Sequence, residues 1–120
     1  MTGVAMNSSL AKLVQHFGEN GQHVLVIGDV MLDRYLIGDV NRISPEAPVP
    51  VLLIKSEQHC AGGAANVAAN LALLGIHTRM VGLIGEDNEA SLLLNAMHVH
   101  GIDTRAMINT SARPTIAKTR

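Results

Sequence analysis

Glycines and a short polar side chain form one stretch that could bind a ligand rich in oxygen atoms. Gly62-Gly63 precedes a run of small and apolar helix-forming residues that ends before Gly75. Paired glycines let another molecule approach the backbone closely, and the first turn of the helix leaves N–H groups free to bind ligand oxygens. Asn66, in that first turn, could hold a hydroxyl group. The alternative is a tight turn before a packed helix.

A carboxylate follows the first apolar strand of the chain. The run His23–Ile27 is apolar and β-branched, which is typical of a strand buried on both faces, and Gly28-Asp29 ends it. Asp33 comes a few residues later and could accept hydrogen bonds from two neighbouring hydroxyls. Ligands bind beyond the carboxyl ends of strands in open α/β sheets, so Asp33 and the glycine pair could meet there. The alternative for Asp33 is a solvated position.

The composition excludes several classes of function. The 120 residues are 48% hydrophobic and 2% aromatic, with a net charge of −1, which favours one globular domain and indicates no nucleic-acid or membrane partner. The single cysteine, Cys60, cannot form an internal disulfide, and we expect it to be buried. The six scattered histidines indicate no metal site. We expect a cytoplasmic protein, because the sequence has no signal-peptide pattern.

Alternating periodicities predict an α/β fold. A short N-terminal extension and helix occupy residues 1–22. Two half-exposed strands, 30–43 and 51–55, flank a proline-rich link and form a small β-flap. Further helices and strands are expected at 64–74, 77–84, 88–99, 102–108 and 114–120, with Asp87 or Asn88 capping the second long helix. The strand at Arg120 looks unfinished, which indicates the N-terminal part of a larger domain.

Three sequence blocks resemble the ribokinase-like (PfkB) carbohydrate kinases. They are Gly28–Tyr35, Arg42–Val51 and Gly62–Ala68. The last block occurs across the family, whereas the Arg-Ile-Ser-Pro-Glu-Ala-Pro-Val-Pro block is similar to the heptose 7-phosphate kinase domain of bifunctional ADP-heptose synthases. The segments 81–87 and 114–120 fit the same pattern, so the resemblance covers nearly everything from residue 23 onward.

The resemblance implies a fold and an activity. The fold would be a three-layer α/β sheet with helices on both faces and a β-lid at about 32–58, within a kinase domain that begins at residue 23. The complete enzyme would use ATP and Mg²⁺ to phosphorylate the anomeric hydroxyl of D-glycero-D-manno-heptose 7-phosphate, for ADP-heptose and lipopolysaccharide core synthesis. Asp33, Gly62, Gly63 and Asn66 match sugar-binding positions. The lid would close over substrate and pair with a second copy of the chain.

The catalytic base and ATP site of the family lie in a downstream Gly-Ala-Gly-Asp type motif that these residues do not contain. The chain also contains neither a P-loop nor a dinucleotide fingerprint. We therefore expect no catalytic residue, no bound cofactor and no activity from the chain alone. Another sugar or nucleoside kinase of this fold is an alternative. A non-catalytic sugar-binding or dimerisation module is a second alternative.

Three basic residues are candidates for binding the phosphate of the substrate. Lys118 and Arg120 are two apart on an expected strand and so share a face. Arg42 lies in the expected lid. An arginine could bind phosphate with a bidentate fork. The alternative is that all three are ordinary solvated side chains.

Overall fold

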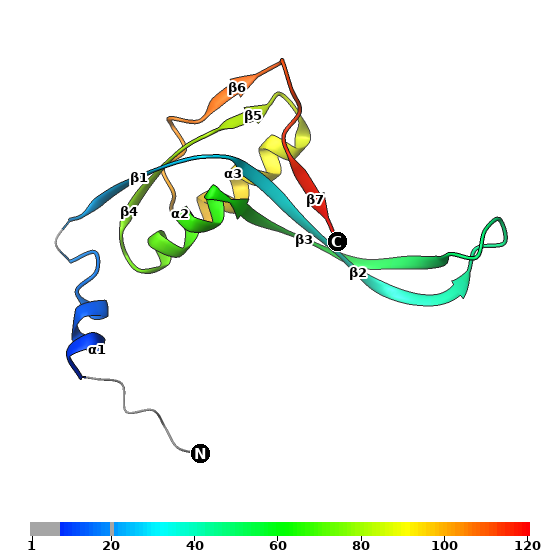
Figure 1. Ribbon diagram of the computed structural model, residues 1–120, viewed down its shortest axis with the longest axis horizontal. Helices are drawn as coiled ribbons and strands as arrows, with labels where there is room; N and C mark the ends of the chain where they lie inside the picture. Colours follow the sequence, from blue (N-terminus) through cyan, green and yellow to red (C-terminus); the bar gives the residue numbers. More distant parts are fainter. Residues whose placement is uncertain (1–7, 20) are drawn as a thin grey trace.

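The computed structural model describes residues 8–19 and 21–120. Of the expected N-terminal extension, residues 1–7 and 20 lie outside the described residues. The apolar spacing correctly predicts helix α1 (Ser8–Gln15), which stands apart from the rest of the chain in Figure 1. Its Leu10 and Leu13 are exposed. Within the described ranges, no helix is long and apolar enough to cross a membrane.

The remaining strands and helices follow one another in the predicted order, and the strands form hydrogen-bonded groups of two or three. They are β1 (His23–Ile27), β2 (Val30–Ile43), β3 (Pro50–Gly63), α2 (Ala64–Leu73), β4 (His77–Val81), β5 (Leu83–Gly85), α3 (Asn88–Val99), β6 (Ile108–Thr110) and β7 (Ala117–Thr119). Strand β1 pairs with β4 in parallel, and β5 pairs with β6 in parallel. Strand β2 has β3 antiparallel on one side and β7 parallel on the other.

Helices α2 and α3 share one apolar core with the strands. Side chains with almost no exposed surface come from β2, β4, β5, α2 and α3, and those of α2 are small alanines. The members of this cluster are Val30, Leu32, Ala61, Ala65, Ala68, Ala69, Met80, Ile84, Ala90, Leu93, Met97 and Ile102. Three alanines on α2 allow close approach between helix and sheet, which is why a chain with few aromatic residues can still bury a core.

The prediction that β1 is buried on both faces is wrong for the described chain. Leu25 is 54% exposed and Ile27 is 70% exposed, whereas Val26 packs against the core. Helix α2 contacts β1, and no described element covers the opposite face. The apolar run therefore predicted the strand correctly, but it did not predict that one face of the strand is exposed.

The expected β-flap is a long antiparallel hairpin that projects from the body (Figure 1). Strand β3 is longer than the predicted 51–55, because its ladder with β2 continues to the pair Val30↔Gly63, immediately before α2. Register shifts between Ile37 and Gly38 and between Val40 and Arg42 mark β-bulges, which bend such hairpins. The base of the hairpin, with Val30, Leu32 and Ala61, contributes to the core, and the β-lid at about 32–58 extends from this base into solvent.

Three expected features near the C-terminal end are refined by the structure. The strand predicted for 77–84 is divided into β4 and β5, which pair with different partners. The strand predicted for 102–108 begins only at Ile108, and Asp103 instead makes an isolated bridge to Arg79. Strand β7 is also shorter than predicted. Asp87 is the N-cap of α3, as predicted, and accepts a hydrogen bond from the Ala90 N–H at 2.8 Å.

Candidate functional site

Asp33 and Gly62 meet at the base of the lid. Asp33 on β2 lies opposite Cys60 on β3, so its carboxylate lies beside Gly62. A Cβ atom at Gly62 would stand 2.9 Å from Asp33 Oδ2 and 2.8 Å from Met31 Cγ. The glycine thus leaves the space that the carboxylate occupies. Within the described chain, the buried Oδ1 of Asp33 has no hydrogen-bond partner, which is costly unless a ligand supplies one.

Gly63 turns the chain from β3 into α2. Its φ is +60°, and a Cβ atom there would lie 2.5 Å from the carbonyl oxygen of Asp29. The Ala64 N–H donates to that oxygen at 2.8 Å, and no side chain caps α2. Asn66 is exposed in the first turn of the helix. The structure therefore places Asp33 against Gly62, with the start of α2 next along the chain.

Strand β7 brings two of the three basic candidates to the same place. Lys118 is the register partner of Asp33, so both side chains lie on one face of the sheet. Arg120 lies two residues further along, and its Nη2 is 3.9 Å from Asp33 Oδ1. The guanidinium also lies over the Tyr35 ring, 5.6 Å from the ring centroid. These contacts could not be predicted from the sequence, because β2 and β7 are far apart in the chain.

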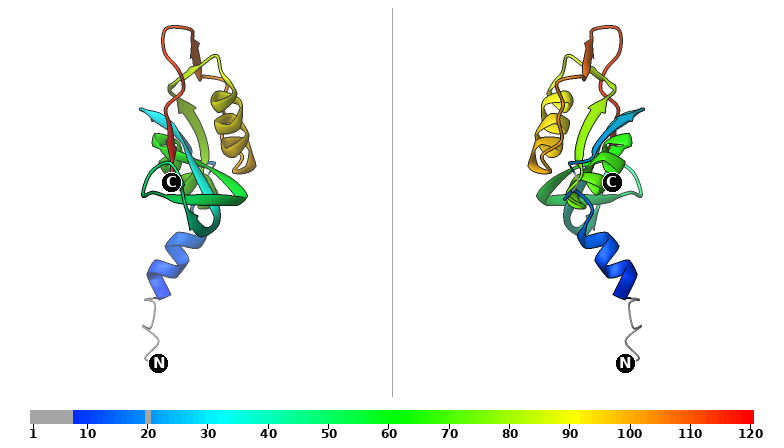
Figure 2. Two further views of the ribbon diagram at one scale, coloured as in Figure 1. Left: turned by 90° about the vertical axis from the view of Figure 1, so that its right-hand side faces the viewer. Right: turned by 90° about the vertical axis from the view of Figure 1, so that its left-hand side faces the viewer.

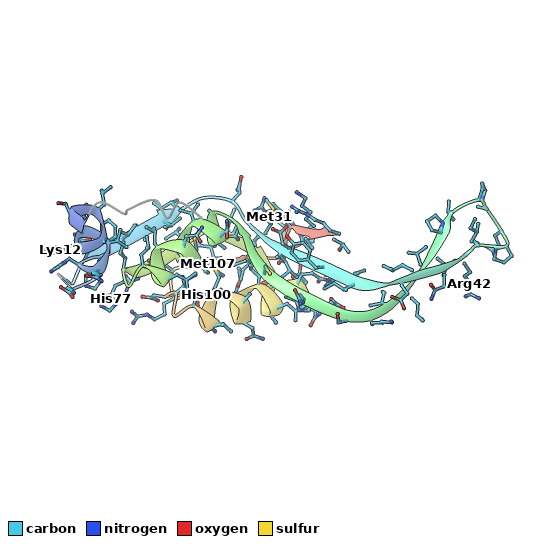
Figure 3. All side chains as sticks on the ribbon, turned by 90° about the horizontal axis from the view of Figure 1, so that it is seen from below. Lys12, Met31, Arg42, His77, His100 and Met107 are labelled. Atoms are coloured by element: carbon cyan, nitrogen blue, oxygen red, sulfur yellow. The ribbon has the colours of Figure 1, made fainter. Side chains whose placement is uncertain are left out.

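Arg42 is separated from these residues. It is nine positions beyond Asp33 on β2, which corresponds to ~30 Å of extended strand. Figure 3 shows Arg42 in the outer part of the lid, far from Met31 at its base. The structure therefore groups Asp33, Lys118 and Arg120 but not Arg42.

The prediction that Cys60 is buried is wrong. Its thiol is exposed, because Cys60 lies opposite Asp33 and points to the face without a helix, whereas the neighbouring Ala61 points into the core. Tyr35 was missed by the sequence reasoning. The signal was its spacing of two from Asp33, which places both side chains on one face of a strand.

A hydrogen-bonded cluster fixes the segment that leads into β7. Thr115 is buried, and its hydroxyl donates to Asp87 Oδ1 at 2.7 Å and accepts from the Gly85 N–H at 2.8 Å. The Thr115 N–H donates to Asp87 Oδ2 at 2.7 Å. These bonds from Thr115 lower the pKa of Asp87, since they stabilise its charged form. The cluster therefore ties β7 to the start of α3.

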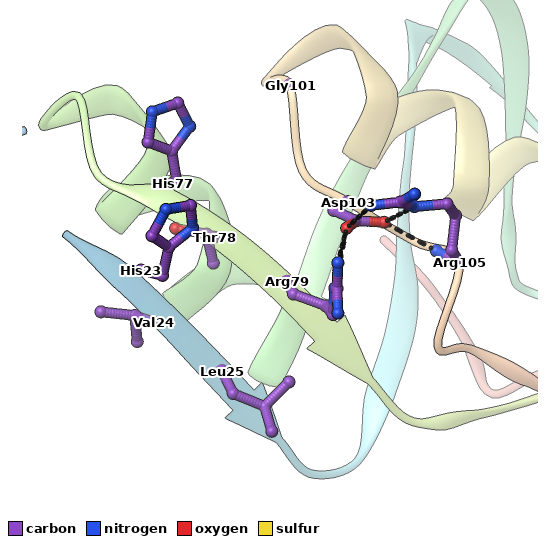
Figure 4. Close-up of a pocket in the computed structure, with 9 residues that line it drawn as sticks. All are labelled: His23, Val24, Leu25, His77, Thr78, Arg79, Gly101, Asp103 and Arg105. Carbon is purple, nitrogen blue, oxygen red and sulfur yellow. Dashed lines mark hydrogen bonds and ion pairs between the residues drawn. The ribbon is translucent and has the colours of Figure 1, made fainter. Parts of the chain in front are cut away.

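A separate cavity of about 550 Å³ lies on β1, β4 and the segment after α3 (Figure 4). Its charged groups are already paired with one another. Arg105 and Arg79 both bond Asp103, and their hydrogen bonds hold the pKa of that carboxyl well below its usual range. The rings of His23 and His77 stack at 5.0 Å. No sequence-predicted site residue lines this cavity.

Sugar kinases are among the solved structures that resemble this chain. The chain matches the fructokinase of Xylella fastidiosa with bound ATP at a TM-score of 0.63 and 27% identity, over 82% of this chain and 29% of that one. It matches Arabidopsis thaliana ribokinase complexed with ribose and ATP at a TM-score of 0.62 and 25% identity, over 82% and 31%. The chain therefore has the ribokinase-like α/β fold, as the sequence predicted.

Residues 21–120 match the pfkB family carbohydrate kinases, and the chain belongs to that family. It is 60% identical to the Bifunctional protein HldE of Methylobacillus flagellatus over 94% of this chain and 23% of the relative. It is 58% identical to the protein of that name in Magnetococcus marinus, over 82% and 20%. The chain thus spans about a fifth of the length of these curated relatives.

Proposed function

We propose that this chain is the sugar-binding and lid portion of an ATP-dependent carbohydrate kinase whose substrate is D-glycero-D-manno-heptose 7-phosphate. The observation that carries the proposal is the Asp33 carboxylate, held against Gly62 with one buried oxygen that has no hydrogen-bond partner among the described residues. The family membership supports a sugar kinase. The heptose substrate is supported by the Arg42–Val51 block and by the identity to the HldE proteins.

In this proposal the residues of the chain bind and orient the sugar. Asp33 accepts hydrogen bonds from the sugar hydroxyls, and the N–H groups of the uncapped first turn of α2 donate hydrogen bonds to the sugar oxygens. Asn66 completes the shell from the same turn. The lid folds over the sugar and excludes water, which would otherwise accept the phosphoryl group.

ATP supplies the phosphoryl group in such a reaction, but the described residues do not fit a triphosphate. A triphosphate favours a free helix N-terminus. The start of α2 directly follows Gly62 and Gly63, and the Asp33 carboxylate lies beside Gly62. The start of α3 is already capped by the Asp87 carboxylate. Asp87 would repel nucleotide phosphates at the start of α3, and the start of α2 is assigned in this proposal to the sugar oxygens. We therefore propose that the chain alone is inactive and that its residues act on the sugar side of the reaction.

Kinetic measurements on the full-length gene product test this role. Asp33→Asn should raise the Michaelis constant for heptose 7-phosphate by about ten-fold or more, since it removes a charged hydrogen-bond acceptor. The Michaelis constant for ATP should change far less. Asp39→Asn, which alters an exposed lid carboxylate paired with Lys55, is the matched control. An unchanged constant in Asp33→Asn would contradict the proposal, and a panel of other sugars and nucleosides would identify another kinase of this fold.

We also propose that the lid pairs with a second copy of the chain. Its outer part exposes large apolar side chains on both strands, including Val40 (55%), Ile43 (68%) and Leu53 (64%). These side chains lie on both faces of the hairpin, since Val40 pairs with Leu52 and Leu53 pairs with Asp39, and such a concentration of exposed apolar surface is typical of an interaction site. A non-catalytic dimerisation module would use the same surface. The kinetic measurements with heptose 7-phosphate distinguish such a module from a kinase. A cytoplasmic location stays a prediction.

A further inference from the structure

We propose that Tyr35 is a positioning residue that holds Arg120 ready for the phosphate group of a sugar phosphate. The site would for this reason prefer a phosphorylated sugar over the same sugar without its phosphate. The inference deepens the proposed function and rests on it, because it concerns the same face of β2 that presents Asp33. It also selects among the basic candidates, since Arg120 and not Arg42 makes the contact.

The backbone fixes where the Arg120 side chain starts. The Arg120 N–H donates to the Arg34 carbonyl at 2.9 Å, and the Arg120 carbonyl accepts from the Leu36 N–H at 2.8 Å. Tyr35 lies between these two partners on β2. Its side chain shares a face with Asp33, because the two residues are two apart on one strand. The ladder therefore delivers the arginine to the ring and the carboxylate together.

The ring then limits where the guanidinium can go. At 5.6 Å from the Tyr35 centroid, the cation lies within the range of a cation–π contact. A long arginine side chain otherwise loses much rotamer freedom on binding a ligand. The contact lowers that cost, because the guanidinium is held near its working position before the ligand arrives.

The guanidinium keeps its donors for a ligand. Its closest approach to Asp33 is 3.9 Å, too long for a hydrogen bond, and the described residues give its N–H groups no hydrogen-bond acceptor. The side chain is 49% exposed. A planar fork of free N–H groups on a fixed side chain suits the bidentate recognition of phosphate.

Charge gives a reason for an arginine at this place. The Asp33 carboxylate would repel a phosphate bound nearby, since both are anions. Arg120 lies against this carboxylate, and Lys118 is opposite Asp33 in the ladder. Arg120 and Lys118 offset the negative charge of the Asp33 carboxylate, which is needed to bind the sugar hydroxyls. A site for unphosphorylated sugars alone would not need them.

Binding measurements on the full-length gene product test the inference. Isothermal titration calorimetry would compare heptose 7-phosphate with heptose and glucose 6-phosphate with glucose. Tyr35→Leu should weaken binding of each phosphorylated sugar by about two- to five-fold, which is the value of an exposed cation–π contact. Arg120→Gln should weaken it by about ten-fold or more. Neither change should alter binding of the unphosphorylated sugars by a comparable factor.

Two further variants separate positioning from a general loss of structure. Tyr35→Phe keeps the ring and should restore the preference for the phosphorylated sugar. Lys55→Gln removes an exposed charge from the lid and should leave the preference unchanged. The inference is overturned if wild-type protein shows no preference for the phosphorylated member of a pair, or if Tyr35→Leu weakens both members equally. Absence of binding to every sugar would instead refute the proposed function, and this inference with it.

Discussion

The two adjacent glycines at the base of the lid are required for different reasons. Gly62 has an ordinary backbone conformation, and its missing side chain makes room for the Asp33 carboxylate. Gly63 has a φ of +60°, which disfavours any residue with a Cβ atom, and a side chain there would press on the Asp29 carbonyl. The first glycine therefore serves the proposed site and the second serves the fold.

Alanine substitutions should separate these two roles. Gly62→Ala should raise the Michaelis constant for the sugar by about ten-fold, since displacement of Asp33 weakens a charged hydrogen bond. Gly63→Ala should lower the free energy of unfolding by about 1–3 kcal/mol, the cost of a strained backbone. The measurements are steady-state kinetics and chemical denaturation of the full-length gene product. Equal effects of both substitutions on both quantities would contradict the distinction.

The sequence could single out candidate residues but not their environment. Asp33 and Gly62 could be selected because a carboxylate follows the first strand and a glycine pair precedes a helix, and the structure brings the two together, while their role in binding sugar stays a prediction. The exposure of Cys60 could not be inferred from its apolar character, because the side of a strand that it occupies depends on register. The contact of Arg120 with Tyr35 depends on a parallel pairing between segments about 85 positions apart, and no local pattern specifies such a pairing.

At the scale of elements, caps and apolar periods predicted the helices well. Asp87 and Gly101 mark the ends of α3, and Gly75 follows α2, because the chemistry of helix ends is local. Strands were less predictable. The division of 77–84 into β4 and β5 follows from two different partners, β1 and β6, which the sequence does not reveal.

The cluster around Asp87 gives the start of α3 a specific pH dependence. Its pKa is lower in the folded protein than the ordinary 3.8, mainly through the bonds from Thr115. A lowered pKa contributes stability that is present above the unfolded value and is lost as the pH falls through the folded value. The contribution should therefore be complete at pH 6, begin to decrease as the pH approaches the ordinary value of 3.8, and be lost only as the pH falls further, through the lower folded pKa.

Substitution of Asp87 should remove that dependence. Asp87→Asn should lower the melting temperature at pH 6 by several degrees, since an amide cannot accept both bonds from Thr115. It should also flatten the fall in melting temperature between pH 6 and pH 3. Thr115→Val should act in the same direction, and Thr115→Ser, which keeps the hydroxyl, should not. Calorimetry across this range is the measurement, and an unchanged slope in Asp87→Asn would refute the role of the cluster.

The whole molecule is flat and extended rather than spherical. Its principal extents are 60 × 50 × 18 Å, and its radius of gyration is 19.0 Å, against roughly 14 Å for a compact domain of this length (Figure 2). The projecting lid and the outlying α1 account for this shape (Figure 1). The composition indicated a globular domain but could not predict this extended shape, because shape depends on which apolar surfaces pack against one another.

The lid should therefore be where the molecule associates with a copy of itself. Leu53 is 64% exposed on β3, opposite Asp39 in the hairpin. Leu53→Ser removes apolar area that a second lid would cover, and a residue central to an interface typically costs more than 1 kcal/mol when truncated. We expect the dissociation constant of the dimer to rise by about ten-fold, as measured by sedimentation velocity over a range of concentrations.

Leu13→Ser is the matched control for this prediction. Leu13 is a leucine of similar exposure, 56%, but it lies on α1, away from the lid in Figure 1. Its substitution should leave the association unchanged, because surface area alone does not make an interface. If both substitutions weaken the dimer equally, the association is a general effect of apolar surface. If the wild-type protein stays monomeric at all concentrations, the exposed side chains of the lid serve closure over the sugar and not self-association.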